Sequence, residues 1–171
     1  MAIFSWLRKK CIWLYLKIVR EKASPEYVAR GWAIGMFCGC LIPFGVQLLI
    51  SVPAAFILKG SKIGASIGTF VTNHFTIFFI YPFQCYVGAK LMGYQLTYAE
   101  ITGALKGVLH EGSLQSMTGL ASEILVSFFI GGAILTAIMT PLTYYVVKKM
   151  VIGHRKRVQR KKQIREAIAK H

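Results

Sequence analysis

The sequence contains no aspartate, and its six acidic residues are all glutamates scattered along the chain. General acid–base catalysis and divalent-metal binding, which usually draw on paired carboxylates, therefore have little to work with. Cysteines are also few: Cys11 and Cys85 are isolated, and Cys38 and Cys40 would point to different sides of a helix. No cysteine–histidine spacing matches a zinc site, and neither a phosphate-binding loop nor a nucleophile elbow is present. The sequence gives no support to an enzyme and predicts no metal or cofactor.

Hydrophobic residues, in contrast, make up 55% of the 171 residues, and the mean hydropathy is +0.53. A soluble domain of this size could not bury so much apolar surface, because monomers tolerate exposed apolar patches of only a few hundred Å². We therefore expect an all-α integral membrane protein.

The basic residues predict how the chain sits in the membrane. Of 21 lysines and arginines, ten lie within 148–171, seven within the first thirty residues, and four between. Basic flanks mark the cytoplasmic side of a membrane. Both termini are therefore expected in the cytoplasm, which requires an even number of crossings and a multi-pass protein.

Two apolar segments, 27–58 and 63–92, are too long for one ordinary membrane helix, and each is interrupted by bending or polar residues. The interruptions fall at 43–47 and 72–76. Non-helical backbone survives at membrane depth only where protein buries it or where it lines a wet cavity. Paired broken helices are therefore the best sequence-level indication of a binding site or pathway.

Two lysines between the broken segments indicate which segment enters the membrane and leaves on the same side. Lys59 and Lys62 favour a cytoplasmic loop, so that 27–58 becomes a re-entrant hairpin with arms shorter than the ~17 residues needed to span. The segment 63–92 then crosses once, with a bend at Asn73. The alternative, in which the first segment crosses and the second is the hairpin, stays open.

The remaining segments complete a membrane domain over 24–150. Residues 1–23 have apolar positions at helical spacing and predict an amphipathic helix lying along the membrane surface. Residues 96–110 predict a second, short amphipathic helix, and 123–147 is the only uninterrupted apolar run long enough to span. We interpret 151–171 as a basic cytoplasmic tail.

Two capping patterns mark helix starts. Ser24, Pro25 and Glu26 are the residue types preferred at a helix N-cap, at its first position and near its positive end. Thr97 and Glu100 have the spacing of a capping box.

Small residues predict how the broken segments pack, because glycines at four-residue spacing let helix backbones approach closely. The residues expected to pack in this way are Gly31, Gly35, Gly39, Gly64 and Gly68. A shift of 29 residues also superposes Gly35 on Gly64 and Pro53 on Pro82, which suggests a degenerate internal repeat. Chance is the competing explanation.

Several of these motifs together resemble the "domain of unknown function 2062" family of small prokaryotic membrane proteins. They are Pro25-Glu26 before a glycine-spaced helix, the turn Ile42-Pro43-Phe44-Gly45-Val46-Gln47, Gly68-Thr69-Phe70-Val71-Thr72-Asn73 followed by Thr76, and Ile130-Gly131-Gly132. The resemblance covers roughly residues 25–150 and implies the cytoplasmic (inner) membrane of a prokaryote. The family usually has Ser-Asn-Pro at the second break, where this chain has Thr72-Asn73-His74. Some members are joined to glycosyltransferases, which implies work on envelope lipids or glycans.

The candidate site residues lie at and near the breaks. Pro43 and Gly45 are expected to form the first break, and the substrate-binding candidates are Arg30, Gln47, Thr72, Asn73, His74 and Thr76. The polar side chains at the breaks either cap the free backbone groups of the broken helices or contact a substrate. Arg30 is either an interfacial anchor, one turn after Glu26, or an anion-binding group, and His74 is either a packed hydrogen-bonding residue or a proton-sensitive one.

These observations predict membrane transport or lipid translocation at a site that the two broken helices form. An anionic or phosphate-bearing lipid is the expected cargo, because helix N-termini at the breaks present N–H groups to negative charge. The alternative is a non-catalytic scaffold or partner subunit of an envelope glycosyltransferase-type enzyme. The basic tail is expected to contact anionic headgroups rather than nucleic acid, and a chain with so few spans is expected to form homo-oligomers.

Overall fold

The computed structural model describes Lys9, Ile12, Trp13 and residues 15–19, 21–43, 45–70, 72, 76–111 and 121–168, with the backbone alone at 105–111 and 121. Over these residues the chain is all-α, with no strand. Its helices are α2 (Pro25–Leu41), α3 (Gln47–Ile57), α4 (Lys62–Thr69), α5 (Ile77–Met92), α6 (Tyr98–Glu111) and α7 (Ala121–Ile168). Both apolar segments are thus interrupted where the sequence predicts a break.

Helix α2 starts as its capping residues predict. The backbone N–H of Tyr27 donates a hydrogen bond of 3.2 Å to Ser24 Oγ, and Pro25 occupies the start of the helix. The helix ends at Leu41, two residues before Pro43, because a residue that precedes proline is pushed away from the helical conformation. Ile42 is accordingly extended.

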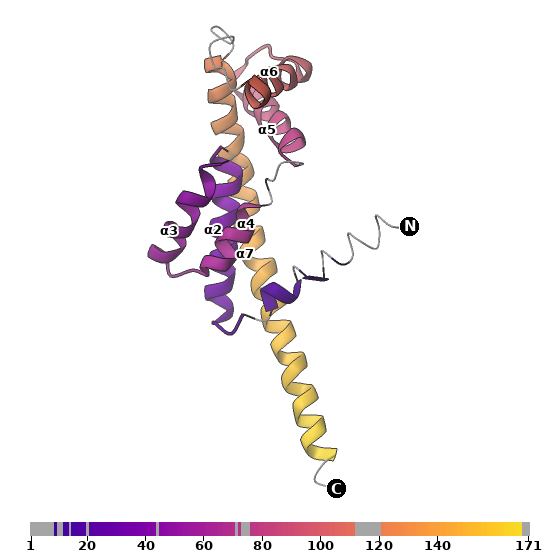
Figure 1. Ribbon diagram of the computed structural model, residues 1–171. Helices are drawn as coiled ribbons and strands as arrows, with labels where there is room; N and C mark the ends of the chain where they lie inside the picture. Colours follow the sequence, from indigo (N-terminus) through magenta and orange to yellow (C-terminus); the bar gives the residue numbers. More distant parts are fainter. Residues whose placement is uncertain are drawn as a thin grey trace.

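Helices α2 and α3 form a hairpin whose two ends meet. After the break α3 runs back beside α2, and the backbone N–H of Ser61 then donates a hydrogen bond of 3.0 Å to Tyr27 O at the start of α2 (Figure 1). Lys59, in the loop between α3 and α4, has a left-handed φ of 51°. The first apolar segment therefore folds as a helical hairpin.

Helices α2 and α4 run parallel, in contact through small residues. A Cβ built on Gly31 would lie 2.6 Å from Ser61 N, one on Gly35 would lie 2.8 Å from Gly68 Cα, and one on Gly39 would lie 3.1 Å from Thr69 O. Successive glycines of α2 meet successive residues of α4 in the same order along the chain, as in a parallel pair. Trp32 closes the other side, since a Cβ on Gly64 would lie 2.7 Å from its ring. Helices α2 and α4 thus approach each other along their glycine-bearing faces.

Helix α7 is the long axis of the molecule (Figure 1). Its 48 residues correspond to roughly 70 Å of helix. Helix α2 packs antiparallel to its middle, and α5 packs antiparallel to its N-terminal part, where a Cβ on Gly88 would lie 2.7 Å from Ser127 C. The predicted span 123–147 lies within α7. The helix does not stop at residue 150 but continues through the basic residues to Ile168.

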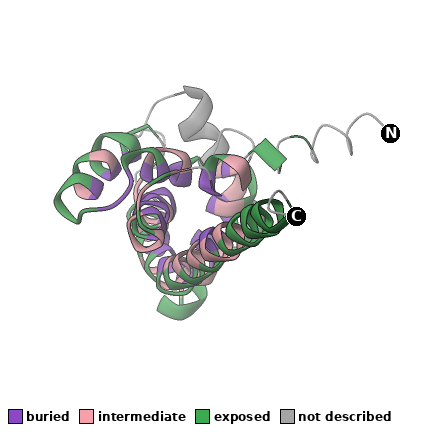
Figure 2. Ribbon diagram, turned by 90° about the horizontal axis from the view of Figure 1, so that it is seen from below, coloured by how far each residue is buried: buried purple, intermediate pink, exposed green. Residues whose placement is uncertain are grey.

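Two apolar clusters hold the ends of the domain. One joins α5, α6 and the start of α7 through Tyr81, Ile101 and Phe128, and the other joins the N-terminal segment, α2 and α7 through Ile18, Trp32 and Val151. Figure 2 shows that burial follows the faces where helices meet, whereas α3 and the end of α7 are mainly exposed. The end of the predicted surface helix therefore also packs against protein, because Ile18 and Val19 are buried there.

The capping box at α6 is confirmed. The backbone N–H of Thr97 donates to Glu100 Oε2 at 2.8 Å, and the Thr97 hydroxyl donates to the same oxygen at 2.7 Å. The backbone bond in particular lowers the pKa of the Glu100 carboxyl from its ordinary value. These bonds fix the start of α6 two residues later than the predicted 96–110.

The internal repeat stays a prediction. In both halves the chain forms helix, break and helix, and a proline, Pro53 or Pro82, lies inside the second helix. The three-dimensional paths differ, however, because α3 turns back along α2 whereas α5 continues onward to α7 (Figure 1).

Candidate functional site

The two breaks meet in one buried cluster, which we call the junction and define as Gly39, Gln47, Thr69 and Thr72. Gly39 belongs to the last turn of α2, Gln47 starts α3, Thr69 ends α4, and Thr72 lies in the second break. The side chains of Gln47, Thr69 and Thr72 are between 0% and 4% exposed. Parallel packing of α2 and α4 places their C-terminal ends side by side, which brings the residues of both breaks together.

Gln47 bridges the breaks with both ends of its amide. Its Nε2 donates to Thr69 O at 3.2 Å and to Thr72 O at 3.3 Å, and its Oε1 accepts a bond of 3.0 Å from the Thr72 hydroxyl. The Thr72 hydroxyl also lies 2.7 Å from Gly39 O, a carbonyl in the last turn of α2.

The junction supplies partners to helix-end carbonyls that no helix can satisfy. The last four C=O groups of a helix lack intrahelical donors, and an unpaired buried polar group costs about 1–3 kcal/mol. Gly39 O and Thr69 O are two such groups. Both receive a side-chain donor here, and Thr69 O also accepts a bond of 3.3 Å from the backbone N–H of Thr72. For Gln47 and Thr72 the geometry therefore agrees with the capping alternative, in which these side chains hold broken helices together.

The other predicted site residues of the second break flank the junction in sequence. Asn73 and His74 lie outside the described residues. Thr76 is half-buried and is the N-cap of α5, and its carbonyl accepts bonds from Phe79 N at 3.0 Å and Ile80 N at 2.8 Å.

The first break depends on one glycine. Gly45 has a φ of +103°, in the region that L side chains rarely adopt, and a Cβ built on it would meet nothing within 4 Å. Together with Pro43 it forms the turn between α2 and α3, as the sequence predicts.

We expect Gly45→Ala to lower stability by about 1–3 kcal/mol through backbone strain alone, since space for the methyl group is available. Thermal melting of the purified protein in detergent measures this. Gly103→Ala is the matched control: Gly103 lies inside α6 with ordinary φ and equally open surroundings, and alanine there should melt at or above the wild-type temperature. Equal behaviour of both variants would contradict the role of Gly45.

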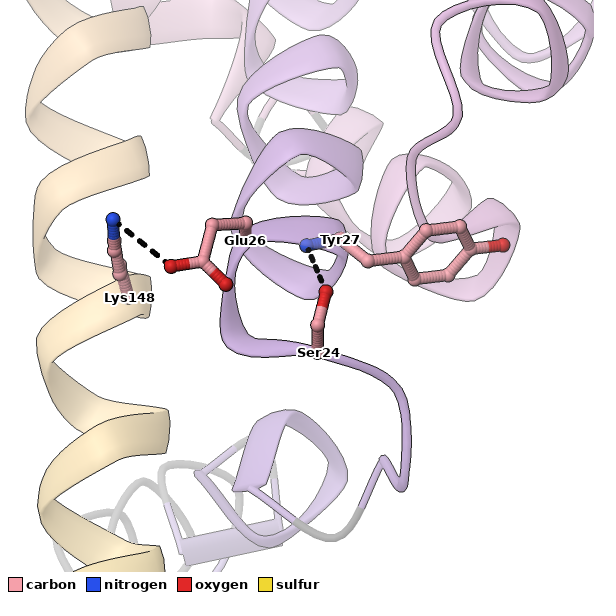
Figure 3. Close-up of polar contacts among 4 residues, drawn as sticks. All are labelled: Ser24, Glu26, Tyr27 and Lys148. Carbon is pink, nitrogen blue, oxygen red and sulfur yellow. Dashed lines mark hydrogen bonds and ion pairs between the residues drawn. The ribbon is translucent and has the colours of Figure 1, made fainter.

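Arg30 is not part of the junction. It is exposed on α2, and the nine residues to Gly39 correspond to roughly 13 Å of helix. Its predicted partner Glu26 instead forms an ion pair of 3.1 Å with Lys148 of α7 (Figure 3). The backbone N–H at the start of α2, and then Lys148, lower the pKa of Glu26, whose carboxylate in turn raises the pKa of Lys148. The pair ties the start of α2 to the end of the apolar part of α7.

Sequence analysis missed a second polar contact, at Gln84 of α5. Its side chain is 1% exposed, and Nε2 donates to Phe128 O of α7 at 2.8 Å. A Cβ on Gly132 would come within 2.5 Å of this nitrogen and 3.2 Å of Cys40 O, so α2, α5 and α7 converge at Gly132. The signal in the sequence was a single amide within the apolar run 77–92, together with Gly131-Gly132.

The features that characterise this chain are two broken helices around a glycine-rich last helix. Residues 10–161 match the family model described as "Uncharacterized protein conserved in bacteria (DUF2062)". The chain belongs to this family. The resemblance stated from the motifs is thereby confirmed, and the DUF2062 match is longer than the predicted 25–150. No curated protein and no solved structure matched the chain.

Proposed function

We propose that this DUF2062 protein is a multi-pass protein of the bacterial cytoplasmic membrane with both termini in the cytoplasm. Helix α7 is long and apolar enough to cross a membrane, over Ser122–Ile168. Large apolar side chains are widely exposed on three helices, for example Leu49 and Ile57 of α3, Phe79 of α5 and Ile138 of α7. Lipid is the environment in which such a surface is stable. The basic end of α7 and the start of α2 lie at the same end of the molecule, as cytoplasmic placement of both requires (Figure 1).

In this placement the hairpin α2–α3 is re-entrant. Its arms have 17 and 11 residues. The first arm is longer than expected and reaches the ~17-residue lower limit for a span, but at roughly 25 and 16 Å both arms are shorter than the ~30 Å hydrocarbon core. The hydrogen bond from Ser61 N to Tyr27 O holds the end of the hairpin beside its start, so the chain leaves on the side from which it entered. Helices α4 and α5 then cross once as a broken helix, and α7 crosses back.

We infer that the protein translocates an anionic, phosphate-bearing lipid past the two breaks. The observation that carries this function is the meeting of both breaks in the buried junction, within helices whose outer faces are apolar. Broken helices that converge at membrane depth are typical of substrate sites in transporters. The junction holds the breaks together, and Asn73, His74 and Thr76, which follow Thr72 in the sequence, are the proposed cargo contacts. Arg30, exposed near the cytoplasmic end, is proposed as an interfacial anchor or an entry point for the anion.

One observation favours a scaffold instead. The amide of Gln47 uses its hydrogen-bonding groups on protein partners, which a purely structural junction also explains. In that case the domain would form homo-oligomers or support an envelope glycosyltransferase-type enzyme, and its exposed apolar faces would contact that partner.

Reconstitution of the pure protein separates the two functions. In vesicles carrying a fluorescent phosphatidylglycerol, a membrane-impermeant reductant quenches only the outer leaflet, which is about half of the label. Translocation brings inner-leaflet label within reach, so we expect quenching well beyond half in protein-containing vesicles. Quenching that stops at half, with pure protein correctly inserted, would contradict translocation and leave the scaffold.

The variants Asn73→Leu and Gln47→Leu assign roles in the same assay. Both remove an amide and roughly conserve bulk. We expect Asn73→Leu to melt close to wild type and to lose most quenching beyond half, whereas Gln47→Leu should lose stability first. Full translocation by an Asn73→Leu protein would remove Asn73 from the site.

A further inference from the structure

A basic groove lies where the N-terminal segment meets the continuation of α7, and the translocation proposed above does not use it. Its volume is about 430 Å³, and it is lined by Tyr15, His154, Arg157, Val158, Arg160, Lys161 and Ile164. The residues contributed by α7 recur at three- and four-residue spacing, so they form one face of the helix. The two walls of the groove are joined by a contact of 3.2 Å between Tyr15 Oη and His154 Nδ1.

The charges in the groove are all of one sign. Arg157, Arg160 and Lys161 line it, and among the described residues no carboxylate does. The neighbouring Lys162 is paired instead with Glu166, at 3.7 Å. An adjoining hollow of about 340 Å³ shares His154 but contains Glu21, and its Arg155 is engaged by the carbonyls of Glu21 and Ala23. The groove is therefore the part of this surface whose cations suit an anion.

We propose that this groove binds the phosphomonoester headgroup of a lipid. A phosphomonoester carries a charge of about −1.5 to −2 and three strong acceptor oxygens, which suits three cations and a hydroxyl better than a phosphodiester with a single charge does. Arginine forms paired hydrogen bonds with phosphate oxygens.

The location favours a lipid over a free phosphate. Helical side chains tilt toward the N-terminus of their helix, which for α7 is the direction of the proposed span, and long cationic side chains extend further toward the membrane surface. The other wall of the groove belongs to the segment that carries Trp13, which is 56% exposed with the Lys17 ammonium over its ring at 5.0 Å. Tryptophan with basic residues is typical of a membrane interface.

This inference rests on the membrane placement proposed above but not on translocation, so binding is measured in detergent. The full-length protein is titrated with dioctanoyl phosphatidic acid, a phosphomonoester, and with dioctanoyl phosphatidylglycerol, dioctanoyl phosphatidylcholine and inorganic phosphate, and its melting temperature is followed. We expect phosphatidic acid to stabilise at the lowest concentration. Equal stabilisation by phosphatidylglycerol would contradict the preference for a phosphomonoester. Equal stabilisation by inorganic phosphate would contradict the assignment of the ligand as a lipid.

Two triple variants with the same loss of charge locate the site. Arg157→Gln, Arg160→Gln and Lys161→Gln together should weaken phosphatidic acid binding about a hundred-fold, given the contribution of each basic residue near a membrane surface. Lys149→Gln, Lys156→Gln and Arg165→Gln remove three cations of α7 that do not line the groove and should weaken it less than ten-fold. Equal losses in the two variants, or no loss in the first, would overturn the site. Loss of translocation with unchanged binding would concern the proposed function alone.

Discussion

Replacing Gly35 by alanine is expected to lower the melting temperature in detergent by roughly 5 °C or more. The added Cβ would lie 2.8 Å from Gly68 Cα and closer still to the Ala65 carbonyl oxygen. Both neighbours are backbone, so α2 and α4 must move apart, and overpacking of this kind costs roughly 1–3 kcal/mol. Separation of these helices also pulls Thr72 away from Gly39 O, because the junction lies at the end of the same contact.

A graded series of the same substitution tests this contact. A Cβ on Gly39 would lie 3.1 Å from Thr69 O, so Gly39→Ala should cost less than Gly35→Ala. A Cβ on Gly153 of α7 would meet nothing within 4 Å, and Gly153→Ala should stabilise the helix by up to about 1 kcal/mol. If all three variants have the same melting temperature, the distance between α2 and α4 does not limit stability.

The elements that the sequence predicted are those with a local cause. Ser24 caps α2, Thr97 and Glu100 cap α6, and Gly45 permits the positive φ of the first break. The four-residue spacing of Gly31, Gly35 and Gly39 was also enough to predict a helix-packing face, because close helix packing in an apolar chain needs small residues on one face. The caps and the first break depend on neighbouring residues, and the glycine spacing is visible in one segment although the contact it makes is with residues 61–72.

The missed features depend on contacts between distant segments. The basic residues after 150 lack apolar periodicity and were interpreted as a tail, yet lysine, arginine and glutamine are good helix formers and continue α7 to Ile168. Arg155 engages the carbonyls of Glu21 and Ala23, a contact across more than 130 residues of sequence. Gln84 became visible as a packing residue only once α5 lay against Gly131 and Gly132.

Thr72→Val is expected to cause the other large loss of stability, several degrees in melting temperature. Valine keeps the shape of threonine but removes the single hydroxyl proton that Gly39 O and Gln47 Oε1 share, in a site where Thr72 is 0% exposed. Loss of this buried donor costs about 1–3 kcal/mol. Thr102→Val is the control: the Thr102 hydroxyl also donates to a carbonyl, Tyr98 O at 2.7 Å, but at an exposed position where water can replace it.

The double variant Gln47→Leu, Thr72→Val shows whether the two side chains act as one unit. Removing both partners of a buried hydrogen bond costs less than the two single losses added together, because the second change no longer orphans a group. We expect the two losses to fall short of additivity by about 0.5–3 kcal/mol, the range found for residues in contact. Additive losses would contradict a shared junction. In the proposed lipid translocation, a junction that couples both breaks would carry movement at one broken helix to the other through Gln47 and Thr72.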